Sequence, residues 1–287
     1  MTSKRSATDW RTLGLFAIAS GVAVGLGSYG LGLYGADAAT WSRNLFAWFA
    51  GLVLSVPFLL AGRSRRLMIG LVAITVVGLA ASLLVPGQSG VHRWLDVGPL
   101  QINVAALLLP VALVALSTSN IAPAALLAAI GTIGAILVAQ PDASQATAFL
   151  LAAAGILFRR TMPPTLRTLG VLAVGGLALA AWLRPDPLQP VPEVEGIFTL
   201  LAEVSSTLAA AGALALASTC VMPLRRLSSG REGTRQAAIV LSVYFSATAL
   251  LPFVGAFPVP LVGVGMSFPV GFWLAMALLS AHEPQTG

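Results

Sequence analysis

The sequence predicts an all-α, polytopic membrane protein of about ten transmembrane helices. It forms a single integral membrane domain over residues 1–287, with both termini cytoplasmic. Hydrophobic residues make up 57% of the chain and charged residues only 9%, whereas a soluble domain carries about a quarter charged residues. Apolar runs of nearly membrane-spanning length recur along the chain, and most basic residues fall on one side of them.

Ten apolar runs are the candidate spans, because a helix needs roughly 20 mostly apolar residues to cross a bilayer. They cover residues 12–34, 44–61, 67–86, 102–117, 121–139, 144–158, 168–183, 197–221, 236–255 and 261–280. The sixth run is short, and a tight loop joins it to the fifth. These two runs therefore form either two spans or one re-entrant pair.

The basic residues favour two separate spans, because cytoplasmic loops carry an excess of Lys and Arg. With ten spans and a cytoplasmic start, 13 of the 16 Lys and Arg residues are inside, and only Arg43, Arg93 and Arg184 are outside. Merging the fifth and sixth runs would destroy this asymmetry. The charge of +6 therefore reflects short basic loops facing anionic membrane lipids, and it does not indicate nucleic-acid binding.

Acidic residues gather on the opposite, outer side, where they suit acid–base chemistry, metal binding or partner contact. They are Asp37, Asp96, Asp142, Asp186, Glu193 and Glu195. For any single one, an ordinary solvated loop is the simpler interpretation. Glu203 falls within the eighth run, and an ionisable residue inside a span is a functional candidate by default. A neutral acid that holds helices together is an equally good interpretation of Glu203.

The polar loop at residues 90–103 contains Arg93 and Trp94 between two apolar runs. Trp is enriched at membrane–water interfaces, and Arg can hold a phosphate through a bidentate contact. The pair therefore suits the anionic head of a lipid, and a simple interfacial anchor with a solvated Arg is the alternative.

Three further outer stretches, residues 140–146, 192–203 and 251–267, are rich in Pro and in polar residues or Gly. Pro and Gly free backbone groups from helices, which is tolerated at membrane depth only inside protein or beside water. These stretches and the first loop are therefore expected to converge on one wet outer cavity. Arg93 and Trp94 should then lie close to Asp142.

Taken in order, the four stretches resemble the motifs of the SEDS family, the FtsW/RodA/SpoVE-type cell-wall polymerases. The matching residues of the first are Gly90, Arg93, Trp94, Gly98, Pro99 and Gln101. Those of the second are Gln140, Pro141, Asp142 and Ala146, and those of the third are Pro192, Glu193, Ile197, Phe198, Ala202 and Glu203. Those of the fourth are Leu251, Pro252, Gly255, Pro258, Pro260, Gly265 and Ser267. Ten spans with cytoplasmic termini also match the family topology.

The chain departs from the family pattern at acidic and basic positions of these motifs. The Pro-Ser-Glu of the first motif is replaced at residues 102–104, and its Lys falls on Leu107. The outer loop before the third motif is contracted, so the family's essential Asp aligns with Glu195. Glu195, a longer carboxylate in a shortened loop, is either a catalytic base or a loop residue without a catalytic role.

The resemblance implies a glycosyltransferase of the bacterial inner membrane that polymerises lipid II into peptidoglycan glycan strands, in cell division or cell-shape maintenance. It also implies a class B penicillin-binding protein as partner. The catalytic candidates are Glu195 and Glu193, and the substrate-binding candidates are Arg93, Trp94, Gln101, Gln140, Asp142 and Glu203. No cofactor is firmly implied, and a divalent metal at the pyrophosphate is the one candidate.

Two expectations remain open at this point. The missing family residues favour a non-catalytic SEDS relative that binds lipid or acts as a scaffold in the division or elongation machinery, whereas the retained motifs favour an active enzyme. For Glu195, the start of the following helix is expected to favour the charged carboxylate through the helix dipole.

Overall fold

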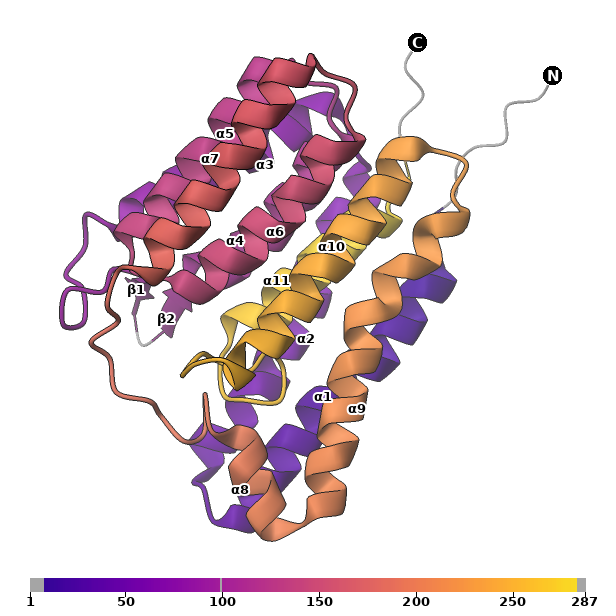
Figure 1. The fold of residues 1–287 in the computed structure, drawn as a ribbon. Coiled ribbons are helices and arrows are strands. Elements are labelled where there is room, and N and C mark those ends of the chain that lie inside the picture. The colour runs from indigo at the N-terminus through magenta and orange to yellow at the C-terminus, as the bar shows by residue number, and fades with distance from the viewer. Residues whose placement is uncertain (1–7, 99, 283–287) are drawn as a thin grey trace.

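The computed structural model describes residues 8–98 and 100–282, so Pro99 and the inside residues Lys4 and Arg5 lie outside the described residues. In the described residues, eleven α-helices and one β-hairpin form an elongated bundle (Figure 1). The first helices are α1 (Trp10–Tyr34), α2 (Ala38–Ala61), α3 (Arg65–Ser82), α4 (Val104–Thr118), α5 (Pro123–Ala139) and α6 (Ala143–Arg159). The others are α7 (Pro164–Trp182), α8 (Ile197–Val204), α9 (Ser206–Val221), α10 (Glu232–Leu250) and α11 (Ser267–Ser280). The all-α membrane architecture is confirmed.

Local sequence signals explain where several helices begin. Asp9 opens α1 and Asp37 opens α2, because each carboxylate accepts a hydrogen bond from a backbone N–H of the first turn, Thr12 N at 3.0 Å and Thr40 N at 2.7 Å. Asp142 opens α6 in the same way, with Gln145 N at 3.1 Å. Asp37, one of the outer acids, is therefore a helix cap that stays exposed to solvent.

The centre of the bundle consists of α4 and α11, which are buried along nearly their whole lengths. Both helices are apolar on all sides, as expected for helices that contact neighbours in every direction. They pack against each other, and α2, α3 and α10 surround them. By contrast, α7 lies at the periphery, and only Gly170, Val174 and Ala181 of its residues are buried, as expected for a helix facing lipid (Figure 1).

Six helical segments among the described residues are long and apolar enough to cross a membrane by length and composition. They are α1, α2, α3, α7, the segment Ser206–Ser228 and the segment Glu232–Phe253. The shorter apolar helices α4, α5, α6 and α11 cover the remaining predicted runs, but they have fewer than 18 residues. The predicted count of ten spans therefore stays a prediction.

Two predicted runs do not form single continuous helices over the predicted residues. The run at residues 197–221 is divided into α8 and α9, because Ser205 adopts an extended backbone and the chain turns back there (Figure 1). Glu203 lies within α8, beside this turn, and is exposed. The run at 261–280 becomes helical only at Ser267, because residues 254–266 are held as an irregular loop.

Both described ends of the chain lie at the same end of the bundle (Figure 1). The backbone N–H of Asp9 donates to the carbonyl of Ser280 at 3.1 Å, and the Asp9 carboxylate accepts from Arg226 at 2.8 Å. Residues that were predicted to lie inside therefore contact one another. The prediction that both termini share one side of the membrane agrees with these contacts.

Candidate functional site

Arg93 lies at the base of the β-hairpin formed by β1 (Trp94–Val97) and β2 (Leu100–Asn103). The strands are antiparallel, and Trp94 pairs with Asn103. Gly98 adopts a positive φ of 60° in the turn, a conformation that glycine adopts at no steric cost. The hairpin leads directly into α4, where the N–H of Val104 donates to the carbonyl of Arg93 at 3.3 Å. These bonds fix the backbone from which the Arg93 side chain extends.

The guanidinium of Arg93 joins two other outer loops. It donates to Asp186 Oδ2 at 2.7 Å, and its Nε lies 3.5 Å from Asp142 Oδ2. It also donates to the carbonyl oxygen of Pro141. Only 6% of Arg93 and 2% of Asp142 are exposed, so both charges depend on each other for compensation. The prediction that Arg93 lies close to Asp142 is confirmed.

Asp142 is held rigidly by the first turn of α6. Its Oδ1 accepts hydrogen bonds from the N–H of Gln145 at 3.1 Å and from the hydroxyl of Ser144 at 3.0 Å. The side-chain oxygen of Gln145 in turn accepts from the buried Tyr244 hydroxyl at 2.6 Å. Asp142 is therefore both a helix cap and the fixed carboxylate that orients Arg93.

Gln140 and Gln101 occupy different environments from the Arg93 ion pairs. Gln140 is fully buried, and its amide donates to the carbonyl of Leu79 at 3.1 Å and to the hydroxyl of Ser82 at 2.7 Å, which joins the ends of α5 and α3. In this conformation Gln140 supports the site through packing. Gln101 is exposed and pairs with Asp96 across the hairpin.

Trp94 and Glu203 also fall at distinct places. Trp94 directly follows Arg93 and is partly buried, on the opposite face of the hairpin from Leu95. Exposed Glu203 lies near the C-terminal end of α8, and among the described residues the ion pairs of Arg93 are with Asp142 and Asp186. The structure therefore brings Trp94, but not Glu203, next to Arg93.

Glu195 lies in a compact turn that precedes α8. The N–H groups of Val194 and Glu195 donate to the carbonyl of Val191 at 2.9 and 3.0 Å, and the Glu195 carboxylate accepts from the N–H of Val191 at 2.7 Å. Burial raises the pKa of Glu195, with a smaller contribution from the negative charge of Asp186. The hydrogen bonds and the positive charge of Arg93 oppose this rise. Glu195 therefore lies within electrostatic reach of the Arg93 ion pairs.

The net pKa shift of Glu195 is opposite in sign to the contribution expected from the helix dipole. The dipole was expected to favour the charged carboxylate, which corresponds to a lowered pKa. Burial outweighs this contribution because the turn packs against a neighbouring loop, and α8 is only eight residues long.

That neighbouring loop is the fourth outer stretch. Val259 N–H donates to the carbonyl of Val194 at 3.1 Å, and Val264 N–H donates to the carbonyl of Glu193 at 2.9 Å. The hydroxyl of Ser267 accepts from the N–H of Asn103 at 2.9 Å, which connects the same stretch to the hairpin. Hydrogen bonds and ion pairs thus join all four outer stretches, and their predicted convergence is confirmed.

Two residues at this convergence had no predicted role. Asp186 was noted only as an outer acid, although its ion pair with Arg93, at 2.7 Å, is shorter than that of Asp142, at 3.5 Å. Its place among the prolines of an outer loop was the available signal. Asn44, in α2, forms hydrogen bonds to backbone groups of the fourth stretch. Its only signal in the sequence was that a polar residue stands at the start of an apolar run.

A divalent metal, the cofactor candidate of the sequence analysis, does not fit these residues. The carboxylates of Asp142 and Asp186 are both directed at the guanidinium of Arg93, which already places a fixed positive charge between them. Within residues 8–98 and 100–282, no three His, Cys, Asp or Glu side chains gather as metal ligands. Arg93 is therefore the cation of this site.

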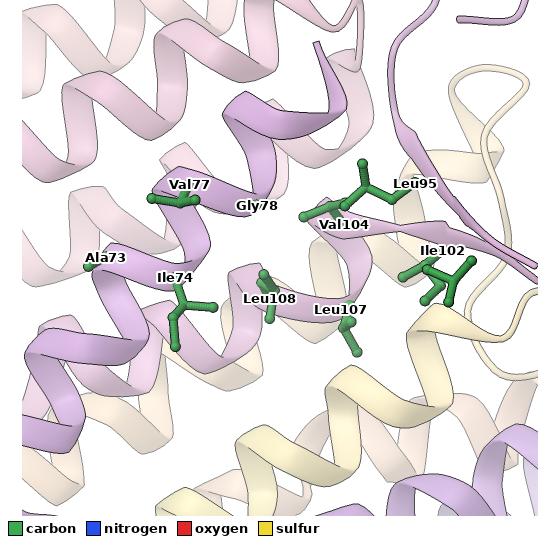
Figure 2. A pocket seen from close by; sticks show the side chains of 10 residues that line it. Ala73, Ile74, Val77, Gly78, Leu95, Ile102, Val104, Leu107 and Leu108 are labelled. Atoms are coloured by element: carbon green, nitrogen blue, oxygen red, sulfur yellow. The ribbon is translucent and has the colours of Figure 1, made fainter. Parts of the chain in front are cut away.

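An apolar groove with a volume of about 420 Å³ lies on one face of the hairpin (Figure 2). Its lining comes from three elements, namely α3, the hairpin and α4. The residues are Ala73, Ile74, Val77, Gly78, Leu95, Val97, Ile102, Val104, Leu107 and Leu108. Leu95 is two residues from Arg93, so the chain that holds the cation also forms a wall of the groove.

No protein-family model and no curated protein sequence matches the chain. Solved structures do match its fold. The rod shape determining protein RodA of Thermus thermophilus matches with a TM-score of 0.69 at 21% sequence identity, over 96% of each chain. A point mutant of that protein gives a TM-score of 0.70 at 22% identity, again over 96% of each chain.

A third solved structure comes from work on the coordination of polymerization and crosslinking by a peptidoglycan synthase complex. One of its chains matches with a TM-score of 0.64 at 22% identity, over 95% of this chain and 98% of that chain. The protein therefore has the RodA fold of the SEDS family, which confirms the fold implied by the four motifs. It is a multi-pass membrane protein by this fold and by its apolar helices.

Proposed function

We propose that the protein is a membrane glycosyltransferase of the SEDS type that polymerises lipid II into glycan strands at the outer face of the bacterial inner membrane. The observation that carries the proposal is the convergence of Arg93, Asp142 and Asp186 from three separate outer loops, and the loop of Asp186 leads into the turn that holds Glu195. A buried cation beside a carboxylate of raised pKa supplies the two groups that glycosyl transfer from a pyrophosphate requires.

In the proposed reaction, Glu195 accepts the proton of a sugar hydroxyl while the hydroxyl oxygen attacks the anomeric carbon of a second substrate. A new glycosidic bond forms as the bond from the anomeric carbon to the pyrophosphate oxygen breaks. Arg93 stabilises the departing pyrophosphate by charge and hydrogen bonding. A raised pKa suits Glu195 for this role, because a general base is most effective when its pKa approaches the working pH.

The apolar groove supports a lipid-linked substrate. A polyprenyl chain buried between Ile74 of α3, Leu95 of the hairpin and Leu108 of α4 would place its pyrophosphate end toward the base of the hairpin, near Arg93. Because such a chain already lies in the hydrocarbon of the bilayer, the groove would contribute close packing and orientation of the substrate rather than a hydrophobic driving force.

The fold similarities also support a process and a partner. One similar protein carries the name rod shape determining protein, and another belongs to a peptidoglycan synthase complex. We therefore propose a role in cell-wall synthesis for cell shape or division, together with a class B penicillin-binding protein that crosslinks the strands.

One observation favours the second candidate, a non-catalytic relative that binds lipid or a partner protein. Asp142 and Asp186 already engage Arg93, and an anionic pyrophosphate would have to compete with both carboxylates. In such a relative, the ion pairs would serve to hold the outer loops together.

Purified full-length protein, incubated with lipid II alone and after co-expression with a class B penicillin-binding protein, distinguishes the two candidates. The proposal expects glycan strands that disappear in the Glu195→Gln variant. Binding of lipid II without strand formation under both conditions would support the non-catalytic alternative.

A further inference from the structure

Asn44 is a buried amide in the outer half of α2, and only 4% of its surface is exposed. An amide buried among apolar helices is costly unless its hydrogen-bonding groups find partners. The side chain of Asn44 can donate two hydrogen bonds and accept two. Its partners therefore show what the residue does.

Three hydrogen bonds join the Asn44 side chain to backbone groups of the fourth outer stretch, residues 251–267. Its Nδ2 donates to the carbonyl of Leu261 at 2.9 Å and to that of Gly263 at 2.5 Å. Its Oδ1 accepts from the N–H of Gly265 at 2.8 Å. One side chain thus fixes alternate residues of a loop that has no regular secondary structure.

The same short loop holds the turn that carries Glu195. Val259 N–H and Val264 N–H donate to the carbonyls of Val194 and Glu193, so the residues bound to the turn are interleaved along the loop with those bound to Asn44, at positions 261, 263 and 265. Contact is so close that a Cβ on Gly263 would lie 2.4 Å from the carbonyl oxygen of Val194. A displacement of α2 would therefore also displace the turn, because the loop is bonded to both.

We infer that Asn44 is a positioning residue for Glu195. Its hydrogen bonds hold residues 261–265 against α2. This loop in turn fixes the position and the burial of the turn at residues 191–196. This inference rests on the proposed glycosyl transfer for its catalytic consequence, whereas the mechanical link between Asn44 and the turn is independent of it.

Holding this loop requires a side chain that both donates to carbonyl oxygens and accepts from an N–H group, as an amide does. Asn44→Asp keeps the size of the side chain and the acceptor for Gly265, but it replaces both donors with a carboxylate oxygen facing two carbonyl oxygens. Asn44→Leu keeps the volume and removes all three hydrogen bonds. If the amide positions the loop, both variants should release it.

Amide hydrogen exchange on the full-length protein in lipid nanodiscs tests the mechanical link. In both variants we expect faster exchange, by about tenfold, in residues 257–266 and also in residues 191–197. Gln236→Leu is the matched control, because it removes another buried amide, whose Nε2 donates to Ile156 O at 3.1 Å, far from the outer loops. Faster exchange confined to residues 257–266 would overturn the inference.

Steady-state polymerisation of lipid II tests the catalytic consequence. We expect kcat to fall by about 100-fold with KM unchanged, since a displaced base no longer reaches the substrate hydroxyl. The acidic limb of the pH–rate profile should also move to lower pH, because a released turn exposes Glu195 to water. An unchanged kcat and pH profile in an otherwise active protein would overturn the positioning role. An inactive wild-type protein would instead count against the proposed function, and hydrogen exchange would still decide the link.

Discussion

The outer and inner ends of the bundle both contain buried arginines, but their surroundings differ. At the outer end, Arg93 is surrounded by the carboxylates of Asp142 and Asp186, with Glu195 in electrostatic reach. At the inner end, Arg63 donates to the carbonyl of Leu279 and to the hydroxyl of Thr234, and the positive charges of Arg226 and Arg231 act on it.

The two ends also differ in how the backbone is held. Burial and the positive charges of Arg226 and Arg231 lower the pKa of Arg63 to about 9, so the inner end accumulates positive charge around regular helix ends. The outer end instead accumulates negative charge on irregular loops that are fastened by long-range hydrogen bonds. Loops positioned by a rigid scaffold commonly carry function, and the difference therefore supports the proposed reaction at the outer end.

Membrane orientation is the all-or-none test of this comparison. Reporter fusions placed after Arg66, Arg160 and Arg226 should all report the cytoplasm, because the basic end should remain inside. Paired alkaline phosphatase and fluorescent protein reporters measure both outcomes. An external signal at any of the three positions would show that the assignment of the two ends is wrong.

Arg93→Ala should have the largest effect on stability. It leaves Asp142 buried without its cation, and removing one partner of a buried ion pair costs about 3–5 kcal/mol. Thermal unfolding in detergent should show a clearly lower transition temperature, accompanied by loss of polymerisation. Arg43→Ala is the control and should leave both properties intact, because Arg43 is an exposed outer arginine whose charge acts on Asp37.

Glu195→Gln should lower the polymerisation rate by about 10²–10⁴-fold, the usual effect of losing a general base. Expression and lipid II binding should stay at wild-type levels, because only the proton acceptor is removed. Glu193→Gln provides the matched control two residues away. If only the Glu193 variant loses activity, the base is Glu193.

The pH dependence of the rate should report the environment of Glu195. As a base, Glu195 works when deprotonated, so the rate should fall as the pH drops through a pKa above the ordinary value for Glu. Asp186→Asn removes a negative charge that raises this pKa, so the acidic limb should move to lower pH. Movement to higher pH would contradict the arrangement of charges described here.

Arg226→Ala at the inner end should have the smallest effect. Its ion pair with Asp9 is partly exposed, and such pairs typically contribute about 0.2–1 kcal/mol. We expect a slight decrease in the unfolding temperature and an unchanged rate of polymerisation. A loss of activity as large as that of Arg93→Ala would remove the functional distinction between the two ends.

Much of the helical framework could be predicted from the sequence, because apolar runs and charge bias act locally. The irregular features could not. The division of α8 from α9 depends on the extended backbone of Ser205, and hydropathy contains no signal for it. Asp186 is 93 positions from Arg93, and only the folded chain shows that they meet. The raised pKa of Glu195 likewise results from tertiary burial, which overrode a local helix-dipole argument.

The bonds between Asn44 and the last outer loop have a consequence for biosynthesis. Asn44 and Gly265 are 221 positions apart, so the loop is bound only after nearly the whole chain has left the ribosome. A nascent chain therefore inserts most of its helices before the Glu195 turn reaches its final place. Truncation before residue 254, which removes this loop and α11, should leave a membrane-inserted but unfinished site.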